Sequence, residues 1–167
     1  MYDRQGRYPQ ASRHAREALG LYQRAGNLTG QAQALNCLGW AHACLGDHEQ
    51  ALTFCQQALP WLQETGDRDS EAGTWDSIGY AYHHLGSYQL AITSYQTALE
   101  LARTIGNSLL EADILNHLGD ALLRTDSHKA AHRVLRQALA ILDRLGHPNA
   151  ADVRAKLANL QLAPQHA

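Results

Sequence analysis

Glycine recurs at a constant interval of forty residues in two separate registers, and this interval limits what the chain can fold into. The members are Gly26, Gly66, Gly106 and Gly146 in one register and Gly39, Gly79 and Gly119 in the other. Alanine follows the same interval at Ala51, Ala91 and Ala131 and at Ala58, Ala98 and Ala138. Self-similarity at a fixed period of roughly 20–50 residues indicates an array of repeats that stack on their neighbours.

Each repeat predicts two helices joined by a short turn. In the unit that begins at Gly26, apolar residues recur at helical spacing over residues 30–45 and again over residues 48–64. Gly46 interrupts the first run, and Gly66 ends the second, because glycine readily adopts the left-handed conformation that closes a helix. The alternation of polar and apolar residues typical of strands does not persist, so we expect an all-α chain.

The small residues predict how the helices pack. A glycine or alanine where two helices cross removes the side chain that would hold the two backbones apart. Gly39, Ala51 and Ala58 would form such a crossing, and one hairpin alone is too small to bury its apolar face. We therefore expect a right-handed α-solenoid of helical hairpins, capped by a C-terminal helix.

The register divides the chain into one repeat domain over residues 1–161 and a disordered tail over residues 162–167. The domain comprises a half repeat, three full repeats and a capping helix, over residues 1–25, 26–65, 66–105, 106–145 and about 148–161. Gly6 aligns with Gly46, so the chain would begin late in a first helix, either as an excised fragment or with an uncovered end. An uncovered apolar end would favour self-association.

The order of large, small and aromatic residues resembles the tetratricopeptide repeat. Each unit has a large residue, then an aliphatic–glycine pair, an aromatic or apolar residue and two alanines seven residues apart. In the first two units a further glycine, Gly46 or Gly86, precedes the alanines. The large residues are Leu35, Trp75 and Leu115, and the later aromatic or apolar positions are His42, Tyr82 and Leu122. The unit of forty residues exceeds the usual ~34, which implies longer helices.

Residues 74–86, 142–148 and 151–154 resemble the C-terminal repeats of actinobacterial antibiotic-regulatory (SARP/AfsR-like) transcriptional regulators, which contain a STAND-class NTPase. Those proteins place a DNA-binding region and the NTPase before the repeats, and this chain contains no Gly-x-x-x-x-Gly-Lys-Ser/Thr motif. The resemblance implies a sensor or regulatory arm of a cytoplasmic bacterial regulator. The implied process is signal transduction that controls antibiotic biosynthesis.

First-helix residues that packing does not use are expected to line a concave groove. These residues are Gln33, Asn36, Trp40, Asp76, Tyr80, His83, Asp113, Asn116, Asp120 and Arg124. Asn36, Asp76 and Asn116 form a column at forty-residue steps, and an asparagine amide can donate to and accept from a peptide main chain. Trp40 and Tyr80 add aromatic area with a polar tip, which is typical of binding hot spots. The alternative is that the polar residues are solvated and that Trp40 packs against its neighbour.

Charge argues against direct binding of nucleic acid. The chain has 14 Lys and Arg residues against 16 Asp and Glu residues, although five arginines gather in the first 24 residues. These are Arg4, Arg7, Arg13, Arg16 and Arg24. No apolar run approaches the ~20 residues of a membrane helix, so no membrane partner is expected.

Motifs for metal binding and catalysis are also absent from the sequence. No Cys-x-x-Cys pair occurs, and the one His-x-x-x-His pair, His128 and His132, is not part of a His-Glu-x-x-His motif. Three cysteines without clustering are typical of a reduced cytoplasmic protein. Asp76, Ser77 and His83 share one helix and lack an oxyanion loop. We therefore expect no enzymatic activity, no cofactor and no metal site.

The sequence as a whole predicts a non-catalytic repeat domain that binds a protein or peptide. The regulator resemblance adds one specific partner, an NTPase domain of the same full-length chain, whose switch the repeats would bias. Two alternatives stay open: a free-standing adaptor scaffold, and a small-molecule sensor that uses the groove around Trp40 and Tyr80.

Overall fold

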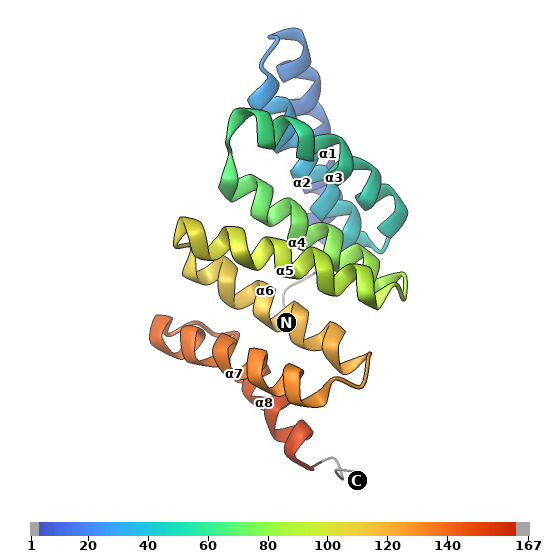
Figure 1. Cartoon of the computed structure of the whole chain (residues 1–167). Helices are drawn as coiled ribbons and strands as arrows, with labels where there is room; N and C mark the ends of the chain where they lie inside the picture. The colour runs from blue at the N-terminus through green and yellow to red at the C-terminus, as the bar shows by residue number, and fades with distance from the viewer. Residues whose placement is uncertain (1–3, 163–167) are drawn as a thin grey trace.

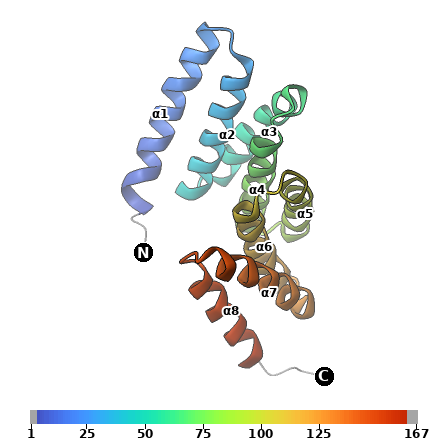
Figure 2. The ribbon, with the colours of Figure 1, turned by 90° about the vertical axis from the view of Figure 1, so that its left-hand side faces the viewer.

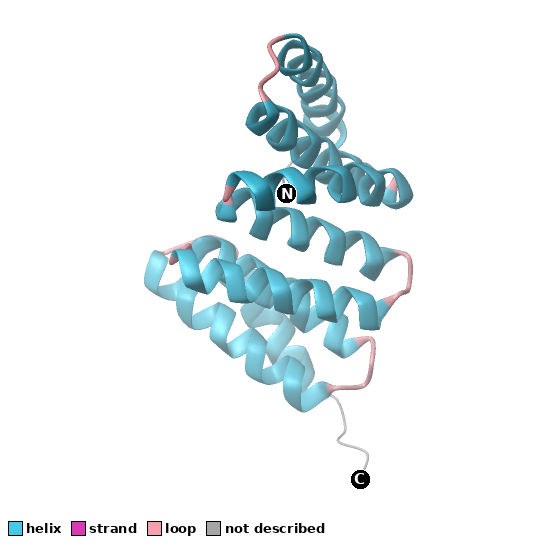
Figure 3. Ribbon diagram, turned by 45° about the horizontal axis from the view of Figure 1, so that its top comes forward, coloured by secondary structure: helices cyan, strands magenta, loops and turns pink. Residues whose placement is uncertain are grey.

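The fold is a stack of helices without strands in the described residues, 4–162 of a computed structural model (Figure 1). The helices are α1 (Arg4–Arg24), α2 (Leu28–Leu45), α3 (His48–Thr65), α4 (Arg68–His84), α5 (Tyr88–Ile105), α6 (Ser108–Leu123), α7 (His128–Leu145) and α8 (Ala150–Leu162). Short turns join them (Figure 3). The predicted all-α solenoid is confirmed.

The stack curves into an arc, with α1 and α2 in one arm and α7 and α8 in the other (Figure 2). We call α2, α4, α6 and α8 the first helices and α3, α5 and α7 the second helices. Each second helix packs against the first helices on both sides of it in the chain. In addition, α2 contacts α4 and α4 contacts α6 directly, so the first helices form the inner side of the arc.

Side-chain caps start the first helices at forty-residue steps. The side-chain oxygen of Asn27 accepts a hydrogen bond from the Gly30 amide at 2.9 Å. The corresponding bonds of Asp67 to Ser70 and of Asn107 to Leu110 are both 3.1 Å. Each cap satisfies an amide that the first turn of a helix leaves without an intrahelical partner.

Residues in the left-handed backbone conformation, with positive φ, lie in the turns that follow the helices. They recur every twenty residues, which is half the interval of the repeat. The glycines at these turns have φ between 60° and 87° and are Gly26, Gly46, Gly66, Gly86, Gly106 and Gly146. Asp126 takes the one remaining position of this series, with φ of 55°. The turns therefore depend on residues that adopt the left-handed conformation at low cost, which glycine does most readily and aspartate more readily than most other residues.

The predicted helix crossings lie at a second set of glycines. An added Cβ on Gly79 would lie 2.6 Å from the Tyr95 ring, and one on Gly119 would lie 2.6 Å from Leu135. Gly39 faces Cys55 in the same way. Residues 55, 95 and 135 thus form a register of their own, in which a second-helix side chain fills the space that glycine leaves. The alanines on either side of this register, including Ala51 and Ala58, are fully buried.

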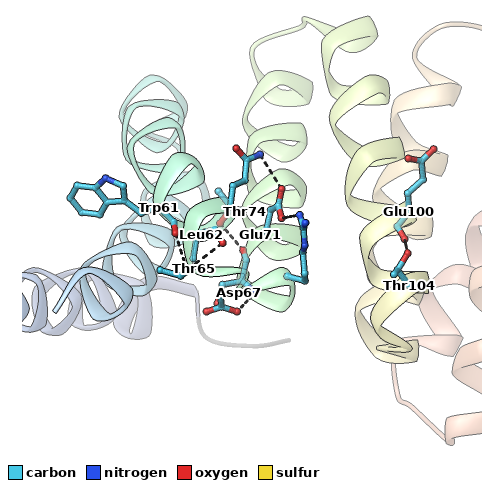
Figure 4. Close-up of polar contacts among 11 residues, drawn as sticks. Trp61, Leu62, Thr65, Asp67, Glu71, Thr74, Glu100 and Thr104 are labelled. Carbon is cyan, nitrogen blue, oxygen red and sulfur yellow. Dashed lines mark hydrogen bonds and ion pairs between the residues drawn. The ribbon is translucent and has the colours of Figure 1, made fainter.

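Polar side chains tie the end of one repeat to the start of the next. Glu71, only 4% exposed, accepts hydrogen bonds from Gln63 at 3.0 Å and Arg68 at 2.7 Å (Figure 4). Forty residues later, Arg103 bonds Glu111 at 2.8 Å. Each tie joins the last turns of a second helix to the first turn of the following first helix, which fixes the angle between successive repeats.

Hydroxyl side chains stabilise the same helix ends through backbone bonds. The Thr65 hydroxyl donates to the carbonyl oxygens of Trp61 and Leu62 at 2.8 Å and 3.3 Å (Figure 4). Thr104 donates to Glu100 at 2.8 Å one repeat later. These bonds give a second donor to carbonyl groups near the ends of α3 and α5.

The alignment of Gly6 with Gly46 predicts that a helix ends near Gly6, and this prediction is wrong. Helix α1 runs from Arg4 to Arg24 without a break at Gly6. Gly6 is helical, whereas Gly46 and Gly86, in the same register, adopt positive φ of 87° and 78° and lie in turns between helices. Most of the predicted tail, residues 163–167, lies outside the described residues.

Two glycines of α4 provide a matched test of the crossing. We expect Gly79→Ala to lower the free energy of unfolding by about 1–3 kcal/mol, because the buried Tyr95 ring cannot move away. Gly73→Ala meets only Asn36 Nδ2 at 3.9 Å, and it should be neutral or stabilising by up to about 1 kcal/mol through helix propensity. Urea unfolding of both variants measures the difference, and equal stabilities would contradict the crossing.

Candidate functional site

Three aromatic side chains from three repeats meet on the inner side of the arc. The Trp40 and Tyr80 rings are 5.4 Å apart in an edge-to-face arrangement. The imidazole of His117 lies 5.6 Å from Tyr80 and 6.5 Å from Trp40. Trp40, Tyr80 and His117, which we call the aromatic cluster, are each half-buried and come from α2, α4 and α6. The predicted pair Trp40 and Tyr80 is therefore brought together on one surface.

A hydrogen bond between repeats orients the His117 ring. His117 Nδ1 donates to Asp76 Oδ1 at 2.9 Å, and Asp76 is only 6% exposed. Burial by itself would lower the pKa of His117, but the carboxylate of Asp76, supported by Asp113 and Asp120, outweighs it and raises that pKa above the usual 6.5. Asp76 therefore serves to hold α6 against α4.

A lysine of α8 engages the third residue of the predicted column. Lys156 Nζ donates to Asn116 Oδ1 at 2.8 Å and to Asp120 Oδ2 at 2.6 Å. Of the column, Asp76 and Asn116 are thus bonded across repeats. Asn36 Oδ1 is buried and has no hydrogen-bond partner among residues 4–162.

A cavity of about 350 Å³ lies between the first halves of the three inner helices. Its lining residues come from α2, from α4 and from the start of α6, and they are Asn36, Asp69, Ser70, Gly73, Asn107, Leu109, Leu110 and Asp113. Asn107 donates to Asp69 Oδ1 at 2.9 Å across the cavity wall. At its edge the exposed Gln33 donates to Asp67 at 2.9 Å, which links α2 to the cap of α4.

The other end of the inner surface carries positive charge. Arg124 donates from Nε to the Tyr88 hydroxyl at 3.1 Å, and its guanidinium carbon lies 5.3 Å from the ring centroid. The His83 ring is 5.4 Å from the same tyrosine, and its Nδ1 is buried without a partner in the described part of the chain. Burial lowers the pKa of His83, and nearby Arg124 adds to this effect while Asp120 opposes it.

His117, Lys156 and Asp69 were not predicted as site residues. Lys156 lies forty residues after Asn116, so extending the forty-residue register into the last helix would have found it. His117 lies one position beyond the column, and its role depends on a pairing with Asp76 that no spacing rule indicates. Gly73 falls outside both glycine registers, so only its neighbours in space reveal the room around it.

Residues 4–162 contain neither a metal-binding cluster nor a membrane-spanning helix. No three side chains of His, Cys, Asp or Glu come together there in a way that could hold a metal ion. None of the helices in that range is long and apolar enough to span a membrane.

The bond between His117 and Asp76 predicts a pH dependence. Because the pKa of folded His117 is raised, its contribution to stability is complete below pH 6.5 and is lost as the pH rises through the raised value. We expect an NMR titration of the His117 ring to show a midpoint above 6.5, and Asp76→Asn to lower this midpoint. Asp126→Asn, at a fully exposed carboxylate, is the control. An unchanged midpoint in Asp76→Asn would contradict the pairing.

Solved structures with the same architecture are similar to this chain over nearly its whole length. BtubC (BKLC) from P. vanneervenii has 19% identity, with 95% of this chain and 67% of BtubC covered and a TM-score of 0.77. Apo RapI has 15% identity, coverage of 97% and 60%, and a TM-score of 0.84. A Rap protein complexed with competence and sporulation factor has 16% identity, coverage of 92% and 45%, and a TM-score of 0.75. Identities this low show the fold alone.

The chain spans only 45–67% of the length of these three proteins. No curated protein matches its sequence. A family model of the tetratricopeptide repeat, in contrast, matches residues 1–64 and 70–144, which is most of the chain. Together with the stacked hairpins, this match shows that the chain belongs to the tetratricopeptide repeat family.

Proposed function

We propose that the chain is a non-catalytic repeat domain that binds a peptide or an extended protein segment along its inner surface. The observation that carries the proposal is the aromatic cluster, in which half-buried rings from three successive repeats lie side by side. Aromatic side chains that are packed yet partly exposed are typical anchors of protein interfaces.

Two further features support an extended ligand. The cavity and the aromatic cluster both lie on α2, α4 and α6, so a ligand that crosses the repeats could contact both. Tetratricopeptide repeats generally serve as scaffolds for protein interaction, and one Rap protein of similar fold is complexed with competence and sporulation factor. A stacked array offers such a ligand a continuous surface because each repeat adds one more first helix to it.

Peptide selection with purified chain tests this proposal. Peptides selected from a random library should bind with an affinity that falls at least about tenfold in Trp40→Ala and in Tyr80→Ala, since hot-spot residues contribute more than about 1–2 kcal/mol. Trp61→Ala is the matched control, because this half-buried tryptophan lies on the second helix α3. Affinity measured by fluorescence anisotropy should be unchanged in the control.

Two results would count against the inner surface as the binding site. The first is an equal loss of affinity in all three variants, which would indicate a general loss of structure. The second is full affinity in both Trp40→Ala and Tyr80→Ala, which would place the peptide elsewhere. Circular dichroism of each variant separates loss of binding from loss of fold.

The biological setting that we propose is the sensor arm of a cytoplasmic bacterial transcriptional regulator that controls antibiotic biosynthesis. Its support is the resemblance of residues 74–86 to the repeats of such regulators. The proposed partner is then an NTPase domain of the same longer protein. A second copy is a further proposed partner, because Ala11 on α1 is exposed whereas Ala51, in the same register, is fully buried.

Removal of the repeats from the full-length protein tests the regulatory role. If the repeats bias the NTPase switch, ATP hydrolysis should differ measurably between the intact and the repeat-deleted protein. Equal hydrolysis, with and without a peptide that binds the repeats, would reject this setting and leave the adaptor scaffold.

A further inference from the structure

The cavity between α2, α4 and α6 is lined by negatively charged side chains and by no positively charged lysine or arginine. Its lining residues include two carboxylates, Asp69 and Asp113, and no lysine or arginine. Leu109 and Leu110 supply apolar wall on the side of α6. A cavity of about 350 Å³ is at the lower end of the size range of ligand pockets, which suits one long side chain.

The two carboxylates retain capacity to accept hydrogen bonds. Asp69 Oδ1 accepts from Asn107 at 2.9 Å, while its Oδ2 has no hydrogen-bond donor among the residues that the structure describes. Burial raises the pKa of Asp113, although the imidazoles of His117 and His147 and a hydrogen bond from Asn149 oppose this rise. Burial therefore disfavours the charged form of Asp113 in the empty cavity, and a cation placed beside it would offset that cost.

The opposite wall contains an acceptor without a partner. Asn36 Oδ1 is buried and makes no hydrogen bond to any described residue. Its Nδ2 faces Gly73 and would lie 3.9 Å from a Cβ added to that glycine. Rotation of the amide by 180° exchanges the two atoms, so Asn36 can present its oxygen to a donor in the cavity.

Gly73 keeps the cavity open. An added Cβ would meet no atom other than Asn36 Nδ2 within 4 Å, in contrast to Gly79 six residues later, whose space Tyr95 fills. The room beside Gly73 is therefore not used by packing between the helices. A larger side chain at this position would occupy the cavity without disturbing the crossing at Gly79.

We propose that this cavity binds the cationic side chain of an arginine or lysine residue in the peptide that occupies the inner surface. The lining carboxylates Asp69 and Asp113 supply acceptors on two walls, and Asn36 supplies a third when its amide is rotated. Together they match a donor that can bond in several directions at once. A guanidinium group carries five N–H donors in a rigid plane, so arginine is the preferred residue. The proposal rests on the proposed function, because the basic residue belongs to the bound peptide.

NMR titration with single-residue probes tests the cavity without knowledge of the natural ligand. N-acetyl-arginine-N-methylamide should shift the backbone amides of Gly73 and Leu110 in a saturable way. The citrulline analogue, which has the same shape and no charge, should bind at least about tenfold more weakly. Asp113→Asn and Asp69→Asn should each weaken the arginine probe, and Gly73→Leu should abolish its binding.

Asp126→Asn is the matched control, because this carboxylate is 97% exposed and does not line the cavity. It should leave the affinity for the arginine probe unchanged. Equal affinity for the arginine and citrulline probes would overturn the proposal, as would the absence of saturable shifts at Gly73 and Leu110. Unaltered binding in Asp113→Asn and Asp69→Asn would do the same.

Failure of the cavity and failure of the proposed function give different results. If library peptides bind in a manner that depends on Trp40 while Asp113→Asn has no effect, the inner surface still binds peptides and the basic-residue cavity is wrong. If no peptide requires Trp40 or Tyr80, the proposed function fails. In that case saturable binding of the arginine probe would still support the cavity as a site for a cation.

Discussion

The close crossing of two helices at a glycine is the contact on which the rest of the structure depends. In each of the three central hairpins, a second-helix side chain fills the space that Gly39, Gly79 or Gly119 leaves open. The filling residue differs between repeats, from cysteine to tyrosine to leucine, so the position of the notch matters more than the identity of the side chain that fills it. Because the notch recurs every forty residues, the hairpins share a similar geometry and stack in one direction.

Stacking in one direction explains why the inner surface combines aromatic and polar groups. The first helices approach each other directly, so their side chains meet across repeats and not only within one hairpin. His117 then reaches Asp76, and Lys156 reaches Asn116 and Asp120. These bonds hold the inner helices in register. The aromatic cluster and the cavity beside Gly73 lie on these same inner helices, where we propose that a ligand binds.

The fold could be predicted from the sequence because the periodicity of its residues reflects local structure. Turn glycines, helical spacing and small residues at crossings are all determined within one repeat, and together they indicate hairpins that must stack. Gly6 misled the alignment because glycine permits a left-handed turn without imposing one, and Gly6 remains helical.

The site was less predictable because its chemistry arises between repeats. The helical face indicated that Trp40 and Tyr80 would share a surface, and they do. The same reasoning treated Asp76 and Asn116 as groups available to a peptide, whereas each bonds a residue about forty positions later. Such a pairing depends on the curvature of the stack and on side-chain length, and neither can be read from spacing. The cavity exists because Gly73, which belongs to neither glycine register, has no side chain to fill the space beside it. It can be recognised only when the positions of α2, α4 and α6 are known.

The most direct test of the central claim is hydroxyl-radical footprinting of the chain with and without a selected peptide, because it measures side-chain exposure to solvent. If the inner surface is the binding surface, Trp40 and Tyr80 will lose reactivity when the peptide is bound, and Trp61 on α3 will not. Protection of Trp61 with unchanged reactivity of Trp40 and Tyr80 would contradict the account.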